Sequence, residues 1–251
     1  MIRVEEGAGV RTISFDRPER RNALTPGMLD GLRAALADAA GKSGPRAVLL
    51  RGEGKVFCAG FDLDLCRDDG AEQGVMRSFL EGLSGAVLAM RAAACPVIVA
   101  AHGAAIAGGC ALLGGADVVV ADRAARLGYP VVRLGISPAV SAPFLLEGIG
   151  AGGARRRLLD HDLFDGVAGA RAGLVHELVS GPEEVDARAR EIARVLAEKP
   201  PLAMRATKRW AMEVADGSKM EGRAARALDA SVSLVRGEEA RERLREVWGK
   251  R

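Results

Sequence analysis

The longest apolar stretch of the chain, residues 92–121, sets the first limit on its fold. A membrane-spanning helix needs about 18 or more consecutive apolar residues without charge. A proline, a histidine, several glycines and Asp117 interrupt this stretch, so we expect no membrane span. Read in order, it predicts a buried strand at 97–101, a turn, a short helix at 108–114 and a second strand at 118–121.

The same alternation of strand-like and helix-like segments is found toward the amino terminus. Thr25 followed by Pro26 is typical of a helix start, because threonine caps the first turn and proline fits the first helical position. The other expected elements are strands at 10–15 and 47–51 and helices at 25–40 and 76–94. Strands with few polar positions, alternating with helices, indicate an α/β fold with a buried sheet.

The character of the chain changes after residue 181. Three helix-like segments follow, at 183–199, 202–214 and 221–248, and no strand-like run is found beyond about residue 180. We predict a core at 1–181 and an all-helical C-terminal region at 182–251. Either the core or another subunit must cover the apolar side chains of this region, which are Leu228, Val232, Leu234, Leu244, Val247 and Trp248.

Charge and cysteine content exclude several classes of protein. The formal net charge is only +3, and the one tight basic run, 155–157, has no interleaved aromatic residues. We interpret it as a solvated helix face and expect no nucleic-acid binding. The four cysteines form no C-x-x-C pair, and the first residues lack a signal-peptide pattern, so we expect reduced thiols and a cytoplasmic location. No residues show metal-ligand spacing, so no metal is expected.

Two of the predicted strand-to-helix turns are rich in glycine, one at 52–61 and one at 103–109. A glycine inside a helix costs about 1 kcal/mol relative to alanine, so the pairs at 108–109 and 114–115 need a reason. One reason is close packing of backbone against backbone. The other is that N–H groups at a helix start favour a negative oxygen, and two that converge form an oxyanion hole. The residues alone leave both explanations open.

Five segments in this order resemble one family: DRPERRNAL (16–24), VFCAGFDL (56–63), HGAAIAGGCALL (102–113), LGYPVVRLGISPAVSAPFL (127–145) and GARAGLVHELV (169–179). They are similar to the crotonase superfamily, the enoyl-CoA hydratase and isomerase family, over essentially the whole chain. Residues 133–179 are especially similar to bacterial hydratases that act on branched-chain and methylglutaconyl-type CoA thioesters. The resemblance implies an α/β spiral of β-β-α units with an all-helical C-terminal region used in trimer contacts.

The resemblance also implies a shared chemistry, which is to bind an acyl-CoA thioester and stabilise the enolate formed at its carbonyl. Carried over by motif, the two oxyanion-hole donors are the backbone N–H groups of Phe61 and Gly108. The implied CoA-binding residues are Arg20 near the phosphates, together with Ala59, Phe61, Asp62, Leu63, Asp64, Gly108 and the tail residue Lys250. Coenzyme A is part of the substrate, so no separate cofactor is expected, and the implied assembly is a homotrimer or a hexamer.

The sequence departs from the family pattern at the positions of its catalytic acids. Hydratases of the family place one glutamate where this chain has Ala111, and another where it has Val131. A third position, which carries an acid in some isomerases and a dehalogenase, is Ala139. General acid and base groups contribute about 10²–10⁴-fold each. The sequence therefore does not support hydration by a glutamate pair, and any acid–base groups are nonstandard.

Other side chains on these segments are candidates to replace the acids. Tyr129, the only tyrosine, either hydrogen-bonds the substrate or serves as a weak acid, or it is a wall residue. Asp62 is expected to cap the following helix, and Cys110 to be a small core residue. The remaining polar candidates are Asp64, Ser137 and Ser141, while His102 is expected to brace its loop and His161 and His176 to be surface or packing residues.

Two interpretations stand beside an acyl-CoA enzyme of the hydratase/isomerase type. One is an acyl-CoA-binding protein that has kept the oxyanion hole and lost catalysis. The other is an NAD(P)-binding oxidoreductase, suggested by a G-x-G-x-x-G match at 148–153. A dinucleotide fingerprint needs a strand directly before the glycines, and the segment 144–147 is too short and polar for one. We therefore discount the oxidoreductase.

Overall fold

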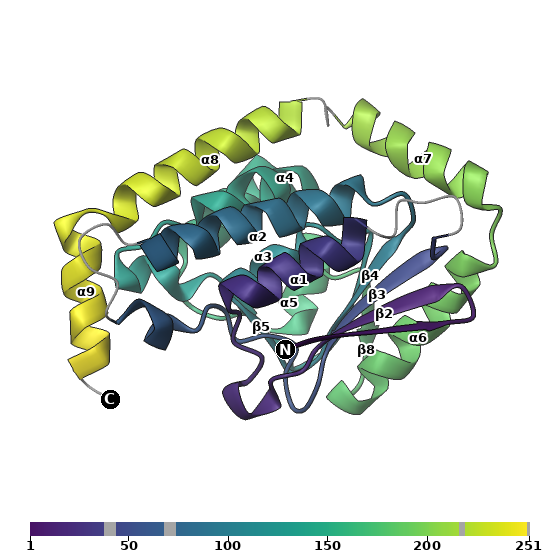
Figure 1. Cartoon of the computed structure of the whole chain (residues 1–251), viewed down its shortest axis with the longest axis horizontal. Helices are drawn as coiled ribbons and strands as arrows, with labels where there is room; N and C mark the ends of the chain where they lie inside the picture. Colours follow the sequence, from purple (N-terminus) through teal and green to yellow (C-terminus); the bar gives the residue numbers. More distant parts are fainter. Residues whose placement is uncertain (38–43, 68–73, 216–218, 250–251) are drawn as a thin grey trace.

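The computed structural model of the chain describes residues 1–37, 44–67, 74–215 and 219–249. Its main sheet has the strand order β1-β2-β3-β4-β6-β8 (Figure 1), with β1 antiparallel to β2 and the other neighbours parallel. The bounds are β1 (Ile2–Gly7), β2 (Val10–Phe15), β3 (Ala47–Gly52), β4 (Val97–Ala101), β6 (Val118–Asp122) and β8 (Glu177–Val179). A second sheet pairs β5 (Ala104–Ile106) with β7 (Arg126–Gly128). The predicted α/β class is confirmed.

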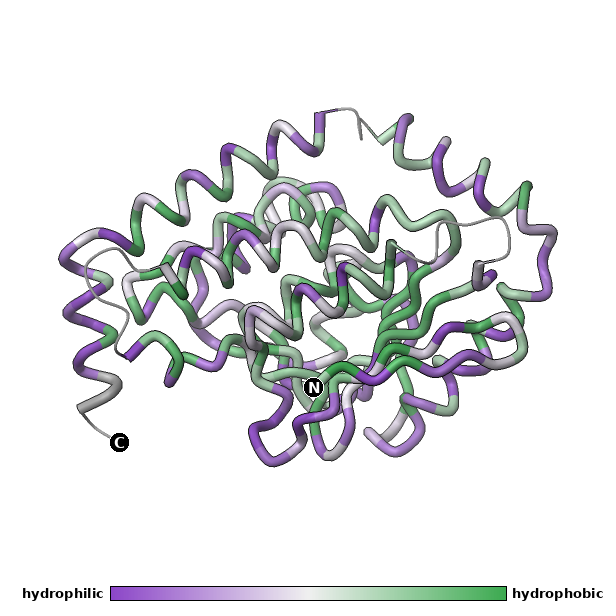
Figure 2. The backbone as a smooth tube through the Cα atoms, in the orientation of Figure 1, coloured by the Kyte–Doolittle hydropathy of each residue, from purple (hydrophilic) through white to green (hydrophobic). Residues whose placement is uncertain are grey.

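The inner strands are buried on both faces, as their apolar sequences predict. Successive residues of a strand point to opposite faces, so Val48 and Leu50 of β3 join one core while Ala47 and Leu49 join a second, smaller one. Figure 2 shows the hydrophobic colour concentrated along these strands. A buried parallel sheet of this kind needs helices on both of its faces, and the fold supplies them.

The helices that cover the two faces come from distant parts of the chain. The larger core lies under α1 (Pro26–Ala37) and α2 (Gly74–Ala92). The smaller core lies under α6 (Pro182–Ala197), which presents one valine and three alanines at intervals of four residues. Small side chains on this stripe let the backbone of α6 approach the sheet closely. Residues 182–197 thus pack on the sheet, and the predicted division at residue 181 stays a prediction.

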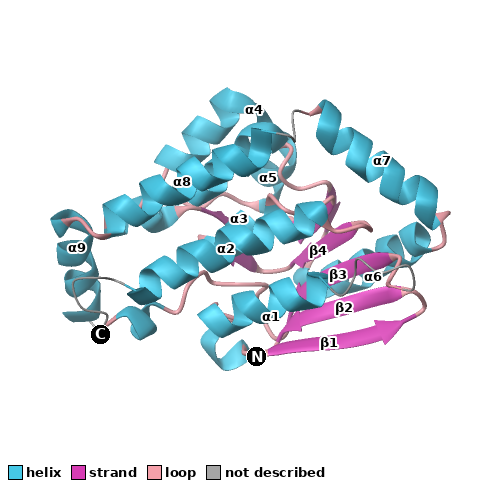
Figure 3. Cartoon of the chain, turned by 45° about the horizontal axis from the view of Figure 1, so that its top comes forward, coloured by secondary structure: helices cyan, strands magenta, loops and turns pink. Residues whose placement is uncertain are grey.

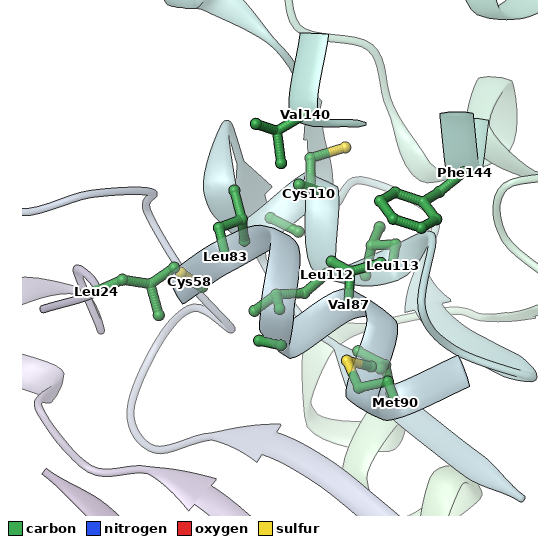
Figure 4. Packing of buried hydrophobic residues seen from close by; sticks show 14 of the residues in the cluster. Leu24, Cys58, Leu83, Val87, Met90, Cys110, Leu112, Leu113, Val140 and Phe144 are labelled. Carbon is green, nitrogen blue, oxygen red and sulfur yellow. The ribbon is translucent and has the colours of Figure 1, made fainter. Parts of the chain in front are cut away.

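A short helix, α3 (Gly108–Leu113), lies within the larger core. All of its residues are buried. Figure 4 shows Cys110, Leu112 and Leu113 among Leu83 and Val87 of α2 and further apolar side chains. A helix of this length is not stable by itself in water, so packing rather than propensity fixes it. The helices α4 (Ala142–Leu159) and α5 (Gly166–Ala172) follow later in the chain.

The C-terminal helices α7 (Pro201–Val214), α8 (Met220–Val235) and α9 (Glu238–Gly249) curve around the outside of the molecule (Figures 1 and 3). In the described ranges no strand follows β8, as predicted. The prediction of one continuous helix over 221–248 is wrong, because the chain breaks at Arg236 and Gly237. The N–H of Gly237 donates to the carbonyl of Leu234 at 2.9 Å, and glycine is a poor helix former.

The core covers part of the apolar face of these helices. Val232 and Leu244 are buried, whereas Leu234 is exposed. The side chains of Val247 and Trp248 lie outside the described residues. No helix among those described is long and apolar enough to cross a membrane.

His176 joins two strands of the main sheet and makes stability depend on pH. The N–H of Val119 donates to its Nδ1 at 2.9 Å, so this nitrogen must be unprotonated. Burial lowers the pKa of His176 from its ordinary 6.5, with Asp117 opposing. Because the pKa is lowered in the folded state, the contribution of His176 is complete above pH 6.5 and is lost as the pH falls through the folded-state pKa.

Replacing His176 with asparagine should remove this part of the acid dependence, because an amide oxygen accepts the same bond and does not titrate. Urea unfolding at a series of pH values from about 7.5 to about 5 measures the effect. The stability difference between wild type and variant should shrink as the pH falls. Parallel loss of stability in both proteins would show that His176 does not titrate as stated.

Candidate active site

An apolar cavity of about 160 Å³ lies where the two glycine-rich turns meet α2 and the segment 129–141. Its lining residues are Ala59, Phe61, Leu63, Leu80, Leu83, Ile106, Ala107, Gly108, Tyr129, Pro130, Val131, Leu134, Ile136, Ser137, Pro138, Val140 and Ser141. Both predicted oxyanion-hole donors therefore belong to residues of one cavity. Of the other predicted CoA-binding residues, Ala59 and Leu63 line it, and Arg20, Asp62 and Asp64 do not.

Hydrogen bonds to Leu24 fix the direction of the Phe61 amide. The N–H of Leu24 donates to the carbonyl of Gly60 at 2.7 Å, and the N–H of Asp62 donates to the carbonyl of Leu24 at 2.9 Å. In such a parallel bridge the residue between the two bonded groups points its own N–H to the other side. Gly60 has φ +99°, a conformation that favours glycine. The N–H of Phe61 consequently points away from Leu24.

The amide of Gly108 is placed by a strained residue just before it. Ala107 has φ 52° and ψ −113°, a region that a non-glycine residue enters at a cost of about 1–3 kcal/mol. Its N–H donates to the carbonyl of Gly128 at 2.8 Å, and its carbonyl accepts from Ala111 at 2.9 Å, so both sides of the residue are held. Gly108 follows as the first residue of α3, where the N–H has no partner inside the helix. Neither this N–H nor that of Phe61 donates to any described residue.

Close packing accounts for all four glycines of the two pairs. A Cβ on Gly108 would lie 2.9 Å from Cε1 of Phe61, and one on Gly109 would lie 2.6 Å from the carbonyl oxygen of Cys58. On Gly114 and Gly115 the nearest atoms would be side-chain atoms of Phe144 and Met90, at 2.9 and 3.0 Å. Real Cβ atoms essentially never approach so closely without a shift. Packing of backbone against backbone is confirmed at Gly109, whereas the atoms nearest to Gly108, Gly114 and Gly115 belong to side chains. The donor role of Gly108 stays a separate prediction.

The three positions at which the family resemblance leads us to expect an acid lie in different surroundings. Val131 lines the cavity, whereas Ala111 is buried in α3 and Ala139 is half-buried, both outside the lining. Among the described lining residues no side chain carries a carboxylate, an imidazole, a thiol or an amine. The polar side chains that remain are Tyr129 and two serines.

Tyr129 is almost wholly buried, at 2% exposure. Its hydroxyl donates to the carbonyl of Cys110 at 3.3 Å. Burial, and then the neighbouring Cys110, raise the pKa of Tyr129 well above its ordinary value of 10. The phenol therefore keeps its proton at neutral pH and is a donor, not a base. Burial raises the pKa of Cys110 to about 11, so this thiol is the inert core residue that the sequence predicts.

Comparison with known proteins decides the family. The family model for enoyl-CoA hydratase/isomerase matches residues 5–243. The chain belongs to this family. A Thermus thermophilus relative, whose name places it among the enoyl-CoA hydratases, is 35% identical over 210 residues, which cover 83% of this chain and 82% of the relative.

Two further comparisons agree with this family. The short-chain-enoyl-CoA hydratase of Clostridium acetobutylicum is 30% identical over 209 residues, covering 82% of this chain and 78% of the relative. An enoyl-CoA hydratase/isomerase structure from Xanthobacter autotrophicus Py2 has a TM-score of 0.84 and 30% identity, covering 95% of this chain and 87% of that one. The resemblance to the crotonase superfamily, and its fold, are confirmed.

Within this enoyl-CoA hydratase/isomerase chain, the prediction that Asp62 caps a helix is wrong. Its side chain makes no capping hydrogen bond and lies instead 2.7 Å from Nη1 of Arg17 and 3.3 Å from Nη2 of Arg20. Two guanidinium groups bind a buried carboxylate more strongly than one backbone N–H does. Arg20 also lies 2.7 Å from Asp64, so its guanidinium group contacts the carboxylates of Asp62 and Asp64. Its contact with the phosphates of CoA stays a prediction.

Asn22 is a positioning residue that sequence analysis missed. It is fully buried, has φ 54°, and donates through Nδ2 to the carbonyls of Glu53 at 2.8 Å and Val56 at 2.9 Å. Its Oδ1 accepts from the N–H of Arg17 at 3.0 Å. The signal was an asparagine in a turn, since asparagine tolerates positive φ and bonds nearby backbone. It holds the loop that leads from β3 to Phe61.

The other candidate residues named from the sequence are not among the residues that line the cavity. His102 braces its loop as predicted, with Nε2 3.0 Å from the carbonyl of Gly54. His161 is at the surface beside Asp162. Lys250 lies outside the described residues. In the described part of the chain no group of three or more metal-ligating side chains comes together.

The glycine run at 148–153 lies inside α4, where Gly150 kinks the helix. No strand precedes it, because the helix already begins at Ala142. A dinucleotide fingerprint needs a strand, a tight turn and then a helix. The structure therefore gives the NAD(P) interpretation no support.

Proposed function

We propose that the chain is an acyl-CoA thioester enzyme that holds the thioester oxygen between the N–H groups of Phe61 and Gly108. The observation that carries this proposal is that both residues line one apolar cavity while neither N–H donates to a described residue. An oxygen that gains charge as an enolate forms is stabilised best by fixed donors in a site that excludes water. The names of the relatives support the ligand class, because they are hydratases of enoyl-CoA.

Tyr129 is the proposed proton donor. It lines the cavity, keeps its proton at neutral pH and is held by a long hydrogen bond that a ligand can replace. Val131 and Ala111 leave the usual glutamate positions without a titratable group. In hydration, water adds to the β-carbon of the enoyl thioester, Tyr129 gives its proton to the α-carbon of the enolate that results, and the proton lost by the water returns to the tyrosinate, so the step needs no carboxylate from the chain.

The second candidate function is a non-catalytic acyl-CoA-binding protein. The observation that favours it is the lack of any base among the described lining residues. Both candidates predict binding of an acyl-CoA, and only the enzyme predicts turnover or exchange of the proton next to the thioester carbonyl.

The two candidates are separated by three measurements on the same protein. A titration compares the affinity for free CoA with that for butyryl-CoA. Loss of the conjugated-thioester absorbance of crotonyl-CoA reports hydration, and proton exchange of butyryl-CoA in D₂O reports enolate formation. For an enzyme that uses Tyr129 as its proton donor, Tyr129→Phe should lower the rate of crotonyl-CoA hydration about 10²–10⁴-fold while affinity changes little. Binding without turnover or exchange would leave the binding protein, and no binding of either ester would refute both.

Self-association through α7 is the proposed assembly. Most residues of this helix are exposed, although the side chain of Lys208 is only 9% exposed. Its large apolar side chains Leu202, Trp210 and Val214 are 78%, 60% and 78% exposed. Exposed apolar residues on one side of a helix are typical of a protein interface. Light scattering should give a mass of three or six chains for the wild type, and Trp210→Glu with Val214→Glu should lower it to that of a single chain. A monomeric wild type would contradict the assembly.

A further inference from the structure

A second cavity, of about 310 Å³, lies at the other end of the main sheet from the apolar cavity. The two glycine-rich turns of the apolar cavity follow the strands β3 and β4. The second cavity is built from the segments that precede β3 and β4, together with the turn between β1 and β2 and the start of α7. Because β4 has five residues, it is about 16 Å long, and the two cavities are separate sites.

Three cationic side chains line this second cavity, those of Arg46, Lys199 and Arg205, and none of its described lining residues is acidic. None of the three forms an ion pair with a carboxylate of the described residues. Elsewhere on α6 and α7 such charges are paired, since Arg194 and Arg209 each lie near a glutamate four residues further on. Three like charges around one cavity repel each other unless an anion lies between them.

The turn between β1 and β2 positions Arg46. Its backbone N–H donates to the carbonyl of Gly9 at 2.7 Å. A Cβ on Gly9 would lie 2.8 Å from Nε and 2.9 Å from Nη2 of Arg46, so the guanidinium group lies directly against this turn. The missing side chain of Gly9 thus makes room for the charged group that lines the cavity.

Arg205 lies on the side of α7 that faces the body of the molecule. Lys208, almost one turn further, donates on this side to the carbonyl of Cys95 at 3.1 Å. At about 3.6 residues per turn, the exposed apolar side chains proposed for self-association point away from it, so that contact leaves the cavity open. Burial raises the pKa of the Cys95 thiol, which also lines the cavity, so this thiol is neutral and does not offset the positive charge.

The lining matches a phosphate group better than other anions. Arginine and lysine bind phosphate oxygens through charge-assisted hydrogen bonds, and a phosphate monoester carries about −1.5 to −2 charges at neutral pH, more than one carboxylate does. A volume of about 310 Å³ is at the lower end of the range for small-molecule sites. No described lining residue is aromatic, so a nucleobase would find no ring on which to stack.

We propose that this cavity binds a phosphate group, free or carried by a small molecule other than the CoA ester, through Arg46, Lys199 and Arg205. The bound anion ties the start of α7 to the segment before β3, because Arg46 lies on one side of it and the other two cations lie on the other. The inference does not rest on the proposed function, since no residue that lines the apolar cavity takes part.

The test is a calorimetric titration of the full chain with inorganic phosphate, inorganic pyrophosphate and ribose 5-phosphate, in about 0.1 M sodium chloride. We expect saturable binding of one equivalent per chain, which weakens as the salt concentration is raised, and a rise in Tm with the bound probe. Tighter binding of inorganic phosphate indicates a free anion as the ligand, and tighter binding of ribose 5-phosphate indicates an organic phosphate.

Three variants, Arg46→Gln, Lys199→Gln and Arg205→Gln, each remove one charge and keep a polar side chain. All three positions are exposed, so the fold is little affected. Each variant should weaken pyrophosphate binding about 3- to 10-fold, and the triple variant should show no saturable binding. The matched control is Arg226→Gln, an exposed arginine of α8 outside the lining, which should change the affinity less than about twofold.

A repeat of the titration in excess butyryl-CoA separates this site from one that holds the phosphates of CoA. Pyrophosphate affinity that is unchanged by butyryl-CoA, and is lowered in the three variants but not in the control, supports the inference. Displacement of pyrophosphate by butyryl-CoA, equal affinity in the wild type and all three variants, or no saturable binding of any probe overturns it. These results leave the proposed function standing, because the probes carry no acyl group.

Discussion

Replacing Gly108 with proline should weaken binding of butyryl-CoA about 10- to 100-fold. Proline lacks the N–H, so a carbonyl oxygen buried in the cavity would lose one donor, which costs about 1–3 kcal/mol. The rate of crotonyl-CoA hydration should fall further, by about 10²–10³-fold, because the donor matters most when the oxygen gains charge. Gly108 is the first residue of α3, where proline fits the helix itself, but a proline there also disfavours the φ 52° and ψ −113° of Ala107, so a variant without the ring is needed beside it.

The control for this prediction is Gly108→Ala. Alanine keeps the N–H and introduces the same Cβ, which lies 2.9 Å from the movable ring of Phe61. The alanine variant therefore controls for the Cβ, whereas the proline ring also places Cδ where the amide hydrogen was. Exchange of Gly108 for glycolic acid, which replaces the N–H by an ester oxygen and adds no side chain, gives the same test without a proline ring. Equal affinity in the proline and alanine variants, with an unaffected glycolic-acid variant, would remove Gly108 from the oxyanion hole.

Replacing Lys208 with methionine should lower the free energy of unfolding by about 2–4 kcal/mol. The Nζ of this α7 residue donates to the carbonyls of Met90 and Cys95, each at 3.1 Å, and to Oδ2 of Asp117 at 2.7 Å. Its side chain is only 9% exposed, whereas that of Asp117 is 27% exposed, which places the effect below that of a fully buried pair. Methionine keeps the apolar stem but leaves the carboxylate and two carbonyls without this partner. Urea unfolding gives the measurement.

Arg209→Met is the matched control for Lys208. Arg209 is the next residue of α7, and its contact with Glu213, at 3.7 Å, is largely exposed to solvent. Such pairs contribute little, so the expected change is within about 0.5 kcal/mol. A double variant with Asp117→Asn should recover part of the loss, because it removes the unpaired charge. If Lys208→Met were as mild as the control, Lys208 would not be the residue that fastens α7 to the body.

The motifs made the candidate site predictable only in part. The turns at Phe61 and Gly108 were located from glycine placement and from the order of the family segments, and the structure brings both residues to one cavity. That Ala111 and Val131 carry no carboxylate is readable from residue identity alone, whereas their correspondence to the family's acid positions stays a prediction from the resemblance. The walls contributed by Leu80 and Leu83 carried no signal, since an apolar residue on a helix looks the same whether it faces a cavity or a packed core.

The elements that the sequence does not predict correctly have different causes. The strand β1 is mostly exposed, and the alternation of Ile2 and Val4 with charged residues is too short to indicate a strand by itself, so pairing with β2 decides its structure. The strands β5, β7 and β8 have three residues each, too few to show a period. The sequence predicts one helix over 221–248 because the apolar spacing continues on both sides of Gly237.

The amino-acid sequence by itself determined the α/β class, the buried inner strands, the cap at Thr25 and the family, because each of these follows from local residue types and their spacing. Only the tertiary structure decided that Asp62 pairs with Arg17 and Arg20 instead of capping a helix, and that Lys208 reaches Asp117 across 91 positions of the chain. It also decided that the Phe61 ring stands beside Gly108. The physical reason is that periodicity shows which face of an element is buried, whereas the partner of a charge or a ring depends on which distant segments the fold brings within a few ångströms.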